Sequence, residues 1–432
     1  MVDRYSGLGA LAVSAALLAG CGGGGSAASG AAPSAVADSA AVAASDVGAS
    51  AFSLPQSYTR LRSFTFGSAS DLGYEPVGES RGRLFDLKGD FMATEESPVT
   101  LPRAVLVGGG LAVQAPSGAA GVTPNGIAVG SWFDPDIEAN RGFVHFQSTG
   151  QTQFLPANTR AEFVSETGLV GGHVCTPDGS DCHAFHWSPS SQALAEHPHF
   201  GAVWMNNAGT MVGHYQPAEG TSRLATVDAG GAVTPLPSVD AGPGLSAVVQ
   251  YIADDGTVFL NTGNATTGAQ GDAVVIANGA VTRVGRGIAP RPDICGICDC
   301  SESTGFRAFS ATGHAVGVDT LQYSDKDGVH VAAEVGFHWS ARDGATVLRV
   351  GASDAIPTSV NAQGVVVGAI SAENKPFIWQ KDVGGFRLPF EGEVTGIGDA
   401  GHLLAHSFDP GHASGHTITV YAPNPAASTP GG

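Results

Sequence analysis

One pattern of apolar and polar positions recurs along the chain from about Ser57 to Tyr421. An aliphatic or aromatic residue is followed by a small, usually polar residue, two variable positions and a glycine. An apolar stretch comes next and usually closes on a second glycine. The interval between successive copies ranges from 37 to 57 residues. Seven clear copies have their first glycine at Gly126, Gly168, Gly209, Gly256, Gly313, Gly364 and Gly401.

Each copy predicts a β-hairpin. The first glycine supplies the positive φ angle that a tight turn requires, and the apolar stretch behind it forms the returning strand. A further strand follows in most units and is rich in aromatic residues, as in HAFHW at 183–187 and PFIWQ at 376–380. In weaker copies the matching stretches are LATV, AVVI and TITVY. Beyond the N-terminal segment no stretch shows the 3.6-residue periodicity of a helix, so we expect an all-β fold.

The length of the repeat indicates the architecture. Units of 40–50 residues with about four short strands are typical of propeller blades, whereas the coils of a β-solenoid are shorter, at roughly 20–30 residues. A degraded copy around Gly73, 53 residues before the first clear one, adds an eighth unit. We therefore expect a β-propeller of seven or eight blades over residues 55–421.

This combination of motifs resembles the HAF-repeat extracellular proteins of bacteria, which are named for a His-Ala-Phe tripeptide on one strand. His183-Ala184-Phe185 is the literal match. The partner motif, an Ile-Asn-x-x-Gly-x-x-Val-Gly type of turn, is matched best by Met205 to Gly213 and Val360 to Gly368. The copy at Ile252 lacks the closing glycine, and His-Ala-Phe is absent from most units. The resemblance implies an exported repeat protein with a propeller-like fold, and it transfers no catalytic residues.

The N-terminal segment is typical of an export signal. Residues Leu8 to Gly20 form an apolar run too short to span a bilayer, and Leu18-Ala19-Gly20-Cys21 resembles the lipobox of bacterial lipoproteins. We expect residues 1–20 to be removed and Cys21 to be lipidated, which would anchor the chain at the outer membrane, on its periplasmic or surface face. An ordinary secretory signal with a chance cysteine is the alternative. Residues 21–54, rich in Gly, Ala and Ser, should form a flexible tether, and residues 422–432 an unstructured tail.

Charge restricts the possible partners. Among the 432 residues, 39 are Asp or Glu and 20 are Lys or Arg, which gives a net charge of −19. Nucleic acid and anionic lipid surfaces both require clustered Lys and Arg. We therefore expect no nucleic-acid partner, and contact with a membrane only through lipidated Cys21.

The remaining five cysteines fall into two groups. Cys175 and Cys182 flank the polar turn TPDGSD, and in an oxidising compartment this spacing predicts a disulfide across the hairpin tip. Cys295, Cys298 and Cys300 lie in an insertion between two units. One local disulfide there, pairing Cys295 with Cys298 or Cys300, would leave one thiol. The alternatives are a thiolate metal site, which lacks a fourth ligand nearby, and a redox Cys-x-x-Cys, which requires a helix that the sequence does not predict.

Three histidines occupy the same place in three units, between two large residues of the aromatic strand. They are His145, His186 and His338. Because both faces of a propeller blade pack against neighbours, we expect hydrogen-bonded residues between blades rather than ligands of one metal.

Other motifs match chemistry by letter only. Asp325, Asp327, Gly328 and Glu334 fit part of an EF-type calcium loop without its helices. Gly78-Glu79-Ser80-Arg81-Gly82 and the run from Gly396 to Gly401 spell a nucleophile elbow and a dinucleotide fingerprint without the helix that each needs.

These observations favour a non-enzymatic binding module of the bacterial cell envelope, with a protein or glycan ligand and no cofactor. One alternative is a propeller hydrolase or lyase that acts on envelope carbohydrate, with residues from several blades around a central channel. The other is a metal-handling lipoprotein that uses the Cys-x-x-Cys-x-Cys insertion.

Overall fold

A computed structural model describes most of the repeat region. The predicted signal peptide, Cys21 and nearly all of the predicted tether lie outside the described residues, as do Cys295 and Cys298. Every regular element in the described part of the chain is a β-strand, so it contains no helix that could cross a membrane. The described ranges are 54–66 without 56, 75–77, 91–97, 100–108, 111–116, 119–123, 127–146 without 135, 149, 151–264, 270–289, 300–325, 328–371, 373–390, 392–409 and 415–424.

The described strands form eight antiparallel sheets, which we number as blades in chain order. Blade 1 consists of β2 (Glu75–Val77), β3 (Phe91–Ser97), β4 (Thr100–Gly108) and β5 (Leu111–Pro116). Blade 2 consists of β6 (Ala119–Val122), β7 (Ile127–Asp134), β8 (Ala139–Phe146) and β9 (Gln151–Ala157). Blade 3 consists of β10 (Thr159–Val164), β11 (Val170–Cys175), β12 (Cys182–Trp187) and β13 (Leu194–His197). Blade 4 consists of β14 (Phe200–Met205), β15 (Met211–Tyr215), β16 (Arg223–Val227) and β17 (Val233–Pro235).

The second half of the chain continues the series. Blade 5 consists of β18 (Ser246–Ile252), β19 (Val258–Gly263), β20 (Gln270–Ala277) and β21 (Ala280–Val284). Blade 6 consists of β22 (Cys300–Phe309), β23 (Ala315–Asp325), β24 (Gly328–Ser340) and β25 (Gly344–Val347). Blade 7 has five strands, β26 (Arg349–Val350), β27 (Ser353–Val360), β28 (Val366–Ile370), β29 (Lys375–Gln380) and β30 (Gly384–Arg387). Blade 8 consists of β31 (Glu393–Ile397), β32 (Leu403–Asp409), β33 (Gly415–Pro423) and β1 (Tyr58–Phe66).

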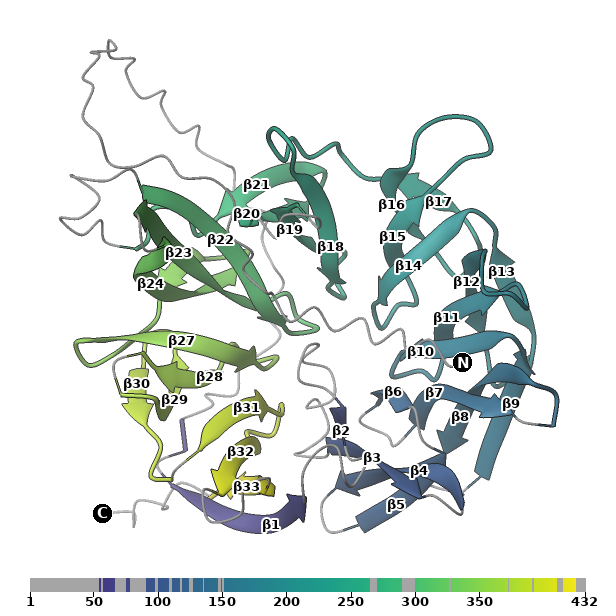
Figure 1. Ribbon diagram of the computed structural model, residues 1–432, viewed down its shortest axis with the longest axis horizontal. Helices are drawn as coiled ribbons and strands as arrows, with labels where there is room; N and C mark the ends of the chain where they lie inside the picture. The colour runs from purple at the N-terminus through teal and green to yellow at the C-terminus, as the bar shows by residue number, and fades with distance from the viewer. Residues whose placement is uncertain are drawn as a thin grey trace, which may run out of the picture.

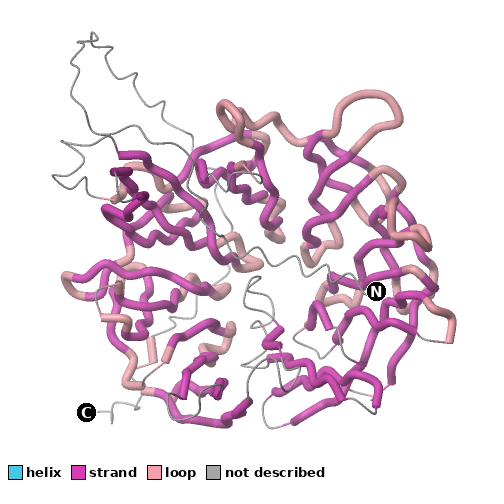
Figure 2. The backbone as a smooth tube through the Cα atoms, viewed as in Figure 1, coloured by secondary structure: helices cyan, strands magenta, loops and turns pink. Residues whose placement is uncertain are grey.

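The sheets stand in a ring, as Figure 1 shows, and the first long strand of each blade lies nearest the centre. Figure 2 shows strands joined by loops throughout the ring. The all-β propeller expected from the repeat length is confirmed, and the described strands make eight blades. The aromatic segments at 183–187 and 376–380 form third strands, β12 and β29, as predicted.

The ring closes through the two ends of the folded region. Strand β1 pairs antiparallel with β33, from Tyr58 opposite Pro423 to Phe66 opposite His416. It thereby supplies the outer strand of blade 8, whose other three strands come from the end of the chain (Figure 1). Residues just outside 55–421 also contact the folded region. Leu54 is buried in a hydrophobic cluster, and Asn424 donates its backbone N–H to Ser57 O over 3.0 Å.

The repeat glycine lies at the turn between the first and second strands of a blade. In the six described copies its φ angle is between 70° and 86°, the left-handed region that glycine enters at little cost. Its N–H donates to the carbonyl of the residue three positions earlier, as from Gly209 to Asn206 over 3.0 Å. The side chain of Asn206 then donates to the carbonyl of Ala253, the matching turn residue of the next blade. The sequence motif therefore encodes both the turn and a link between blades.

The degraded copy around Gly73 was expected to add an eighth unit, and blade 1 is an eighth sheet in that part of the chain. Gly73 itself lies outside the described residues, and β2 begins two positions after it, at Glu75.

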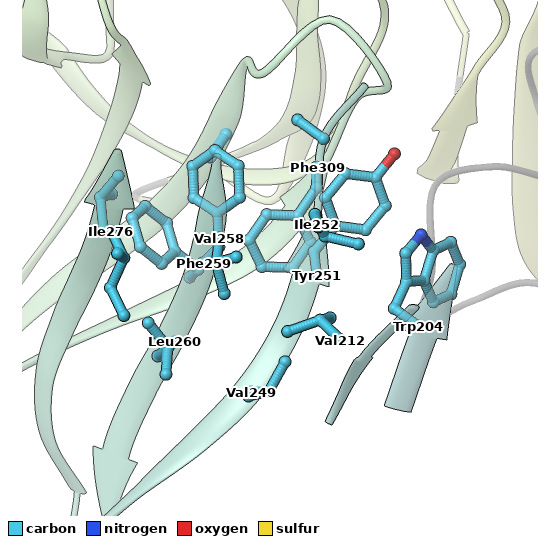
Figure 3. Packing of buried hydrophobic residues seen from close by; sticks show 14 of the residues in the cluster. Trp204, Val212, Val249, Tyr251, Ile252, Val258, Phe259, Leu260, Ile276 and Phe309 are labelled. Carbon is cyan, nitrogen blue, oxygen red and sulfur yellow. The ribbon is translucent and has the colours of Figure 1, made fainter. Parts of the chain in front are cut away.

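Aromatic side chains fill the space between successive blades near the axis. Phe163, Trp204 and Tyr251 each stand one position after a bulge in the first strand of neighbouring blades. The ring centroids of Phe163 and Trp204 are 5.9 Å apart, and those of Trp204 and Tyr251 are 5.0 Å apart. Tyr251 in turn stacks on Phe309 of blade 6 at 5.1 Å, with the two planes 4° apart (Figure 3). Such pairs stabilise beyond their buried area, so they bind blades 3 to 6 into one core.

Candidate binding site at the propeller axis

A β-bulge recurs at one position in the first strand of seven blades. In each, one residue is left out of the pairing with the second strand and lies six positions before the first repeat glycine. A bulge bends a strand and aims the unpaired residue away from the ladder. The seven bulged residues are Ala120, Glu162, Val203, Gln250, Arg307, Thr358 and Thr395.

The closing glycine of the repeat is explained by this bulge. The residue just before the bulge pairs with the closing position, as Ala202 does with Gly213. A Cβ on Gly213 would lie 2.9 Å from the carbonyl carbon of Gly201, 3.0 Å from the Cα of Ala202, and closer still to the carbonyl oxygen. Backbone atoms also obstruct a Cβ at Gly172, Gly317 and Gly368. The second glycine of the motif thus makes room for a strand that bends toward the axis.

The bulged residues face the space around the axis. On β10 the pattern of burial shows Arg160 exposed and Glu162 half-buried, whereas Ala161, Phe163 and Val164 are buried. The same alternation holds on the first strands of blades 4 to 8. Because these strands are innermost, the bulged positions lie close to the axis and their side chains remain accessible there. The sequence offered one signal for this ring, the fixed offset from the turn glycine, but the varied side chains concealed it.

Three consecutive blades together form a pocket of about 270 Å³ on this inner surface. The side chains that line it come from the first strands β22, β27 and β31. They include three of the bulged residues. The lining residues are Arg307, Pro357, Thr358, Glu393 and Thr395.

Hydrogen bonds hold two of the polar groups in this pocket. The Arg307 guanidinium donates to a Glu334 carboxylate oxygen over 2.9 Å, a pair that uses one of its five N–H groups. Thr358 donates its hydroxyl to the carbonyl of Val394 in the next blade, which leaves its oxygen able to accept. Glu393 is exposed, and within the described part of the chain it has no cation at ion-pair distance. The pocket therefore offers a guanidinium paired with Glu334, the carboxylate of Glu393 and two hydroxyl groups.

The three matching histidines are buried and hydrogen-bonded, and one joins two blades as expected. His186 Nε2 lies 2.7 Å from the carbonyl oxygen of Gly209 in blade 4, and its Nδ1 lies 2.6 Å from His197 Nε2. Since a carbonyl only accepts, we assign the proton to His186 Nε2, so His197 donates to His186 Nδ1. Burial lowers the pKa of His186 to about 4, against the weaker opposing effect of the Gly209 carbonyl. His186 is therefore neutral at pH 7.

The other two histidines bond within their own blades. His338 Nε2 lies 3.0 Å from His314 Nδ1, and its ring lies 5.6 Å from Trp379 of blade 7. Burial, helped by His314, lowers the pKa of His338 to about 3. His145 Nδ1 lies 2.9 Å from Thr152 Oγ1, and burial lowers its pKa too. The structure does not bring the three rings together, since they lie in blades 2, 3 and 6.

The predicted disulfide between Cys175 and Cys182 is present, and it joins paired positions of β11 and β12 at the hairpin tip. Cys300 is also disulfide-bonded, to a partner outside the described residues. Because a disulfide sulfur is not a thiolate, Cys300 is not a metal ligand in this state. Among the described residues, no group of three or more His, Cys, Asp or Glu could hold a metal ion.

The remaining motifs have structural roles or lie outside the described part. The run from Gly396 to Gly401 covers the end of β31 and the turn to β32, and it opens onto a strand. Asp325 and Gly328 are paired at the tip of the β23–β24 hairpin, and the carboxylate of Glu334 binds Arg307. The nucleophile-elbow pattern at 78–82 lies outside the described residues.

Comparison with known proteins identifies no family. No family model matches the sequence, and no curated protein matches it. The β-propeller domain of the Trilobed protease from Pyrococcus furiosus is 10% identical, with a TM-score of 0.42 over 73% of this chain and 98% of that chain. TolB from Acinetobacter baumannii is 12% identical, with a TM-score of 0.31 over 84% of this chain and 83% of that chain. An oligogalacturonate lyase in complex with manganese is 12% identical, with a TM-score of 0.37 over 86% of this chain and 99% of that chain.

The class of protein follows from the chain's own sheets. Eight sheets of four or five antiparallel strands around an axis, closed by the N-terminal strand, define a β-propeller. The similarities to solved structures are too low to carry an argument about activity.

Proposed function

We propose that this chain is an exported, lipid-anchored β-propeller that acts as a non-enzymatic binding module of the bacterial cell envelope, with its ligand in the axial pocket. Export is supported by the apolar run before Cys21 and by the Cys175–Cys182 disulfide, because disulfides persist in oxidising compartments. The Gly- and Ala-rich segment after Cys21 would separate the propeller from the membrane.

The observation that carries the proposal is the ring of bulges. The bulge keeps one position in seven blades, while the residue on it changes from alanine to glutamate, valine, glutamine, arginine and threonine. A fixed backbone that presents different side chains builds an asymmetric surface, and asymmetric polar groups are what fix the orientation of a bound ligand.

The pocket chemistry supports binding better than catalysis. Glu393 is the single carboxyl group among the described lining residues, whereas most glycoside hydrolysis uses a pair of carboxyl groups. Arg307 and the hydroxyl groups of Thr358 and Thr395 can hold a polar ligand without any proton transfer.

Co-sedimentation with isolated cell-wall sacculi tests the proposed binding. We expect the protein to sediment with sacculi, and the variant Thr395→Trp, which fills the pocket, to lose most of that binding. Thr282→Trp is the matched control, because Thr282 is exposed on the outer strand of blade 5. Sedimentation of all three proteins to the same extent, or of none, contradicts the proposal.

Membrane fractionation tests the anchor separately. Wild-type protein should partition with membranes, since each buried CH₂ of an acyl chain contributes about 0.8 kcal/mol. A Cys21→Ala variant should become soluble. A variant that still partitions wholly with membranes would contradict lipidation at Cys21.

A further inference from the structure

The axial pocket contains one cation that is already paired and one carboxylate that has no ion-pair partner among the described residues. Arg307 forms an ion pair with Glu334, and this pair leaves four N–H groups of the guanidinium for other acceptors. Glu393, from the first strand of blade 8, has no ion-pair partner within the described part of the chain. The two groups belong to strands on either side of blade 7, whose Thr358 lies between them along the ring.

We propose that the pocket binds a zwitterionic ligand, namely an amino acid or the terminus of a short peptide. Its ammonium group would bind Glu393, and its carboxylate would bind the free N–H groups of Arg307. Thr358 and Thr395 would add hydrogen bonds between the two charges. The inference rests on the proposed function, because it names the ligand class for the same pocket.

The volume of the pocket suits a small unit of a ligand. Pockets for drug-sized molecules are typically about 300–1,000 Å³. The axial pocket, at about 270 Å³, lies just below that range. It can therefore hold one amino-acid unit, free or at the end of a peptide.

Charge disfavours a plain anion as the ligand. The chain has a net charge of −19, and Glu334 already neutralises Arg307. A ligand with only negative charge would meet the unpaired Glu393 and the field of an acidic protein, so it would be repelled. An ammonium group on the ligand offsets this repulsion at Glu393, and the carboxylate can accept from the Arg307 N–H groups that Glu334 does not use.

Isothermal titration with a homologous series tests the proposal. The series runs from glycine through β-alanine and 4-aminobutyrate to 6-aminohexanoate, so that only the distance between ammonium and carboxylate changes. We expect one member to bind best, and its N-acetyl and carboxamide derivatives to bind about tenfold or more weakly, since each loses one charge-assisted hydrogen bond.

Two variants assign the charges. Glu393→Gln should lower the affinity for the parent amino acid and abolish the difference in affinity between the parent and its N-acetyl derivative. Arg307→Gln should likewise abolish the difference in affinity between the parent amino acid and its carboxamide derivative. Arg349→Gln is the control, because Arg349 forms a comparable exposed ion pair with Asp354 at 3.5 Å outside the pocket.

The outcomes separate this inference from the proposed function. If no member of the series binds while Thr395→Trp still abolishes binding to sacculi, the proposed ligand class is wrong and the proposed binding function is retained. Equal affinity for the parent and the N-acetyl derivative would also overturn the inference. If wild-type protein does not bind sacculi at all, the proposed function fails whatever the titration shows.

Discussion

Replacing Gly213 by alanine tests whether the repeat glycine exists to accommodate the bulge. The new Cβ would lie 2.9 Å and 3.0 Å from backbone carbon atoms of β14 and closer still to the carbonyl oxygen of Gly201. No flexible side chain can move aside, so the strand must shift and the hydrogen bonds beside the bulge must weaken. Overpacking of this kind costs about 1–3 kcal/mol, and a lost hydrogen bond adds about 1 kcal/mol. We expect the free energy of unfolding to fall by about 3 kcal/mol.

The predicted effect can be measured by calorimetry. Unfolding entropy is about 2.1 cal/mol/K per residue, so for a fold spanning 54–424 a loss of about 3 kcal/mol lowers Tm by about 4 °C. Gly201→Ala is the control on the partner strand, because its Cβ would lie 3.9 Å from the nearest atom, at an ordinary φ angle. That variant should match or slightly exceed wild type, since alanine reduces the entropy of the unfolded chain. Equal Tm values for the two variants would refute the reasoning.

Three further predictions concern stability. The pKa of His186 is about 4 in the folded state and about 6.5 in the unfolded state, so the unfolded state binds more protons between these pH values. Lowering the pH through that window should therefore reduce the free energy of unfolding by about 3 kcal/mol. Urea titrations at pH 7.5 and 4.5 should show a smaller loss of unfolding free energy on acidification for His186→Gln than for wild type or for the exposed control His214→Gln. Equal losses in all three proteins would show that His186 is not the cause of the acid destabilisation. Replacing Cys175 and Cys182 by serine opens a short loop and should reduce the free energy of unfolding by about 2–3 kcal/mol, and an unchanged urea midpoint under oxidising conditions would contradict this. Deleting residues 1–66 removes β1 and its pairing with β33, which should cost about 5 kcal/mol or more at roughly 1 kcal/mol per hydrogen bond, and a Tm equal to wild type would show that ring closure contributes little.

Local features of the fold were predictable because each blade repeats them. The turn glycines at Gly168 and Gly209 have the positive φ angles that the motif predicts, and segments such as 183–187 form the expected third strands. The closure by β1 was not predictable in this way. Its partner β33 lies about 350 residues away in the sequence, and neither strand carries a motif that marks the other.

The candidate site was harder to predict for a related reason. Its backbone position is repeated, but its side chains differ, so Arg307, Thr358 and Thr395 share only their offset from the turn glycine. Glu393 belongs to the same pocket only because blade 8 stands two blades beyond Arg307 in the ring. The structural roles of the other conspicuous residues were predictable from the repeat. His186 forms the expected hydrogen bond between blades, and Cys175 and Cys182 form the expected disulfide.

Thermal unfolding with and without solubilised cell-wall fragments tests the central claim most directly. A ligand at about 100 times its Kd stabilises a protein by about 2.7 kcal/mol, which for a fold of this size raises Tm by about 3 °C. We predict this shift for wild type and for Thr282→Trp, and its loss in Thr395→Trp. An equal shift in Thr395→Trp would place the ligand elsewhere and contradict an axial binding site.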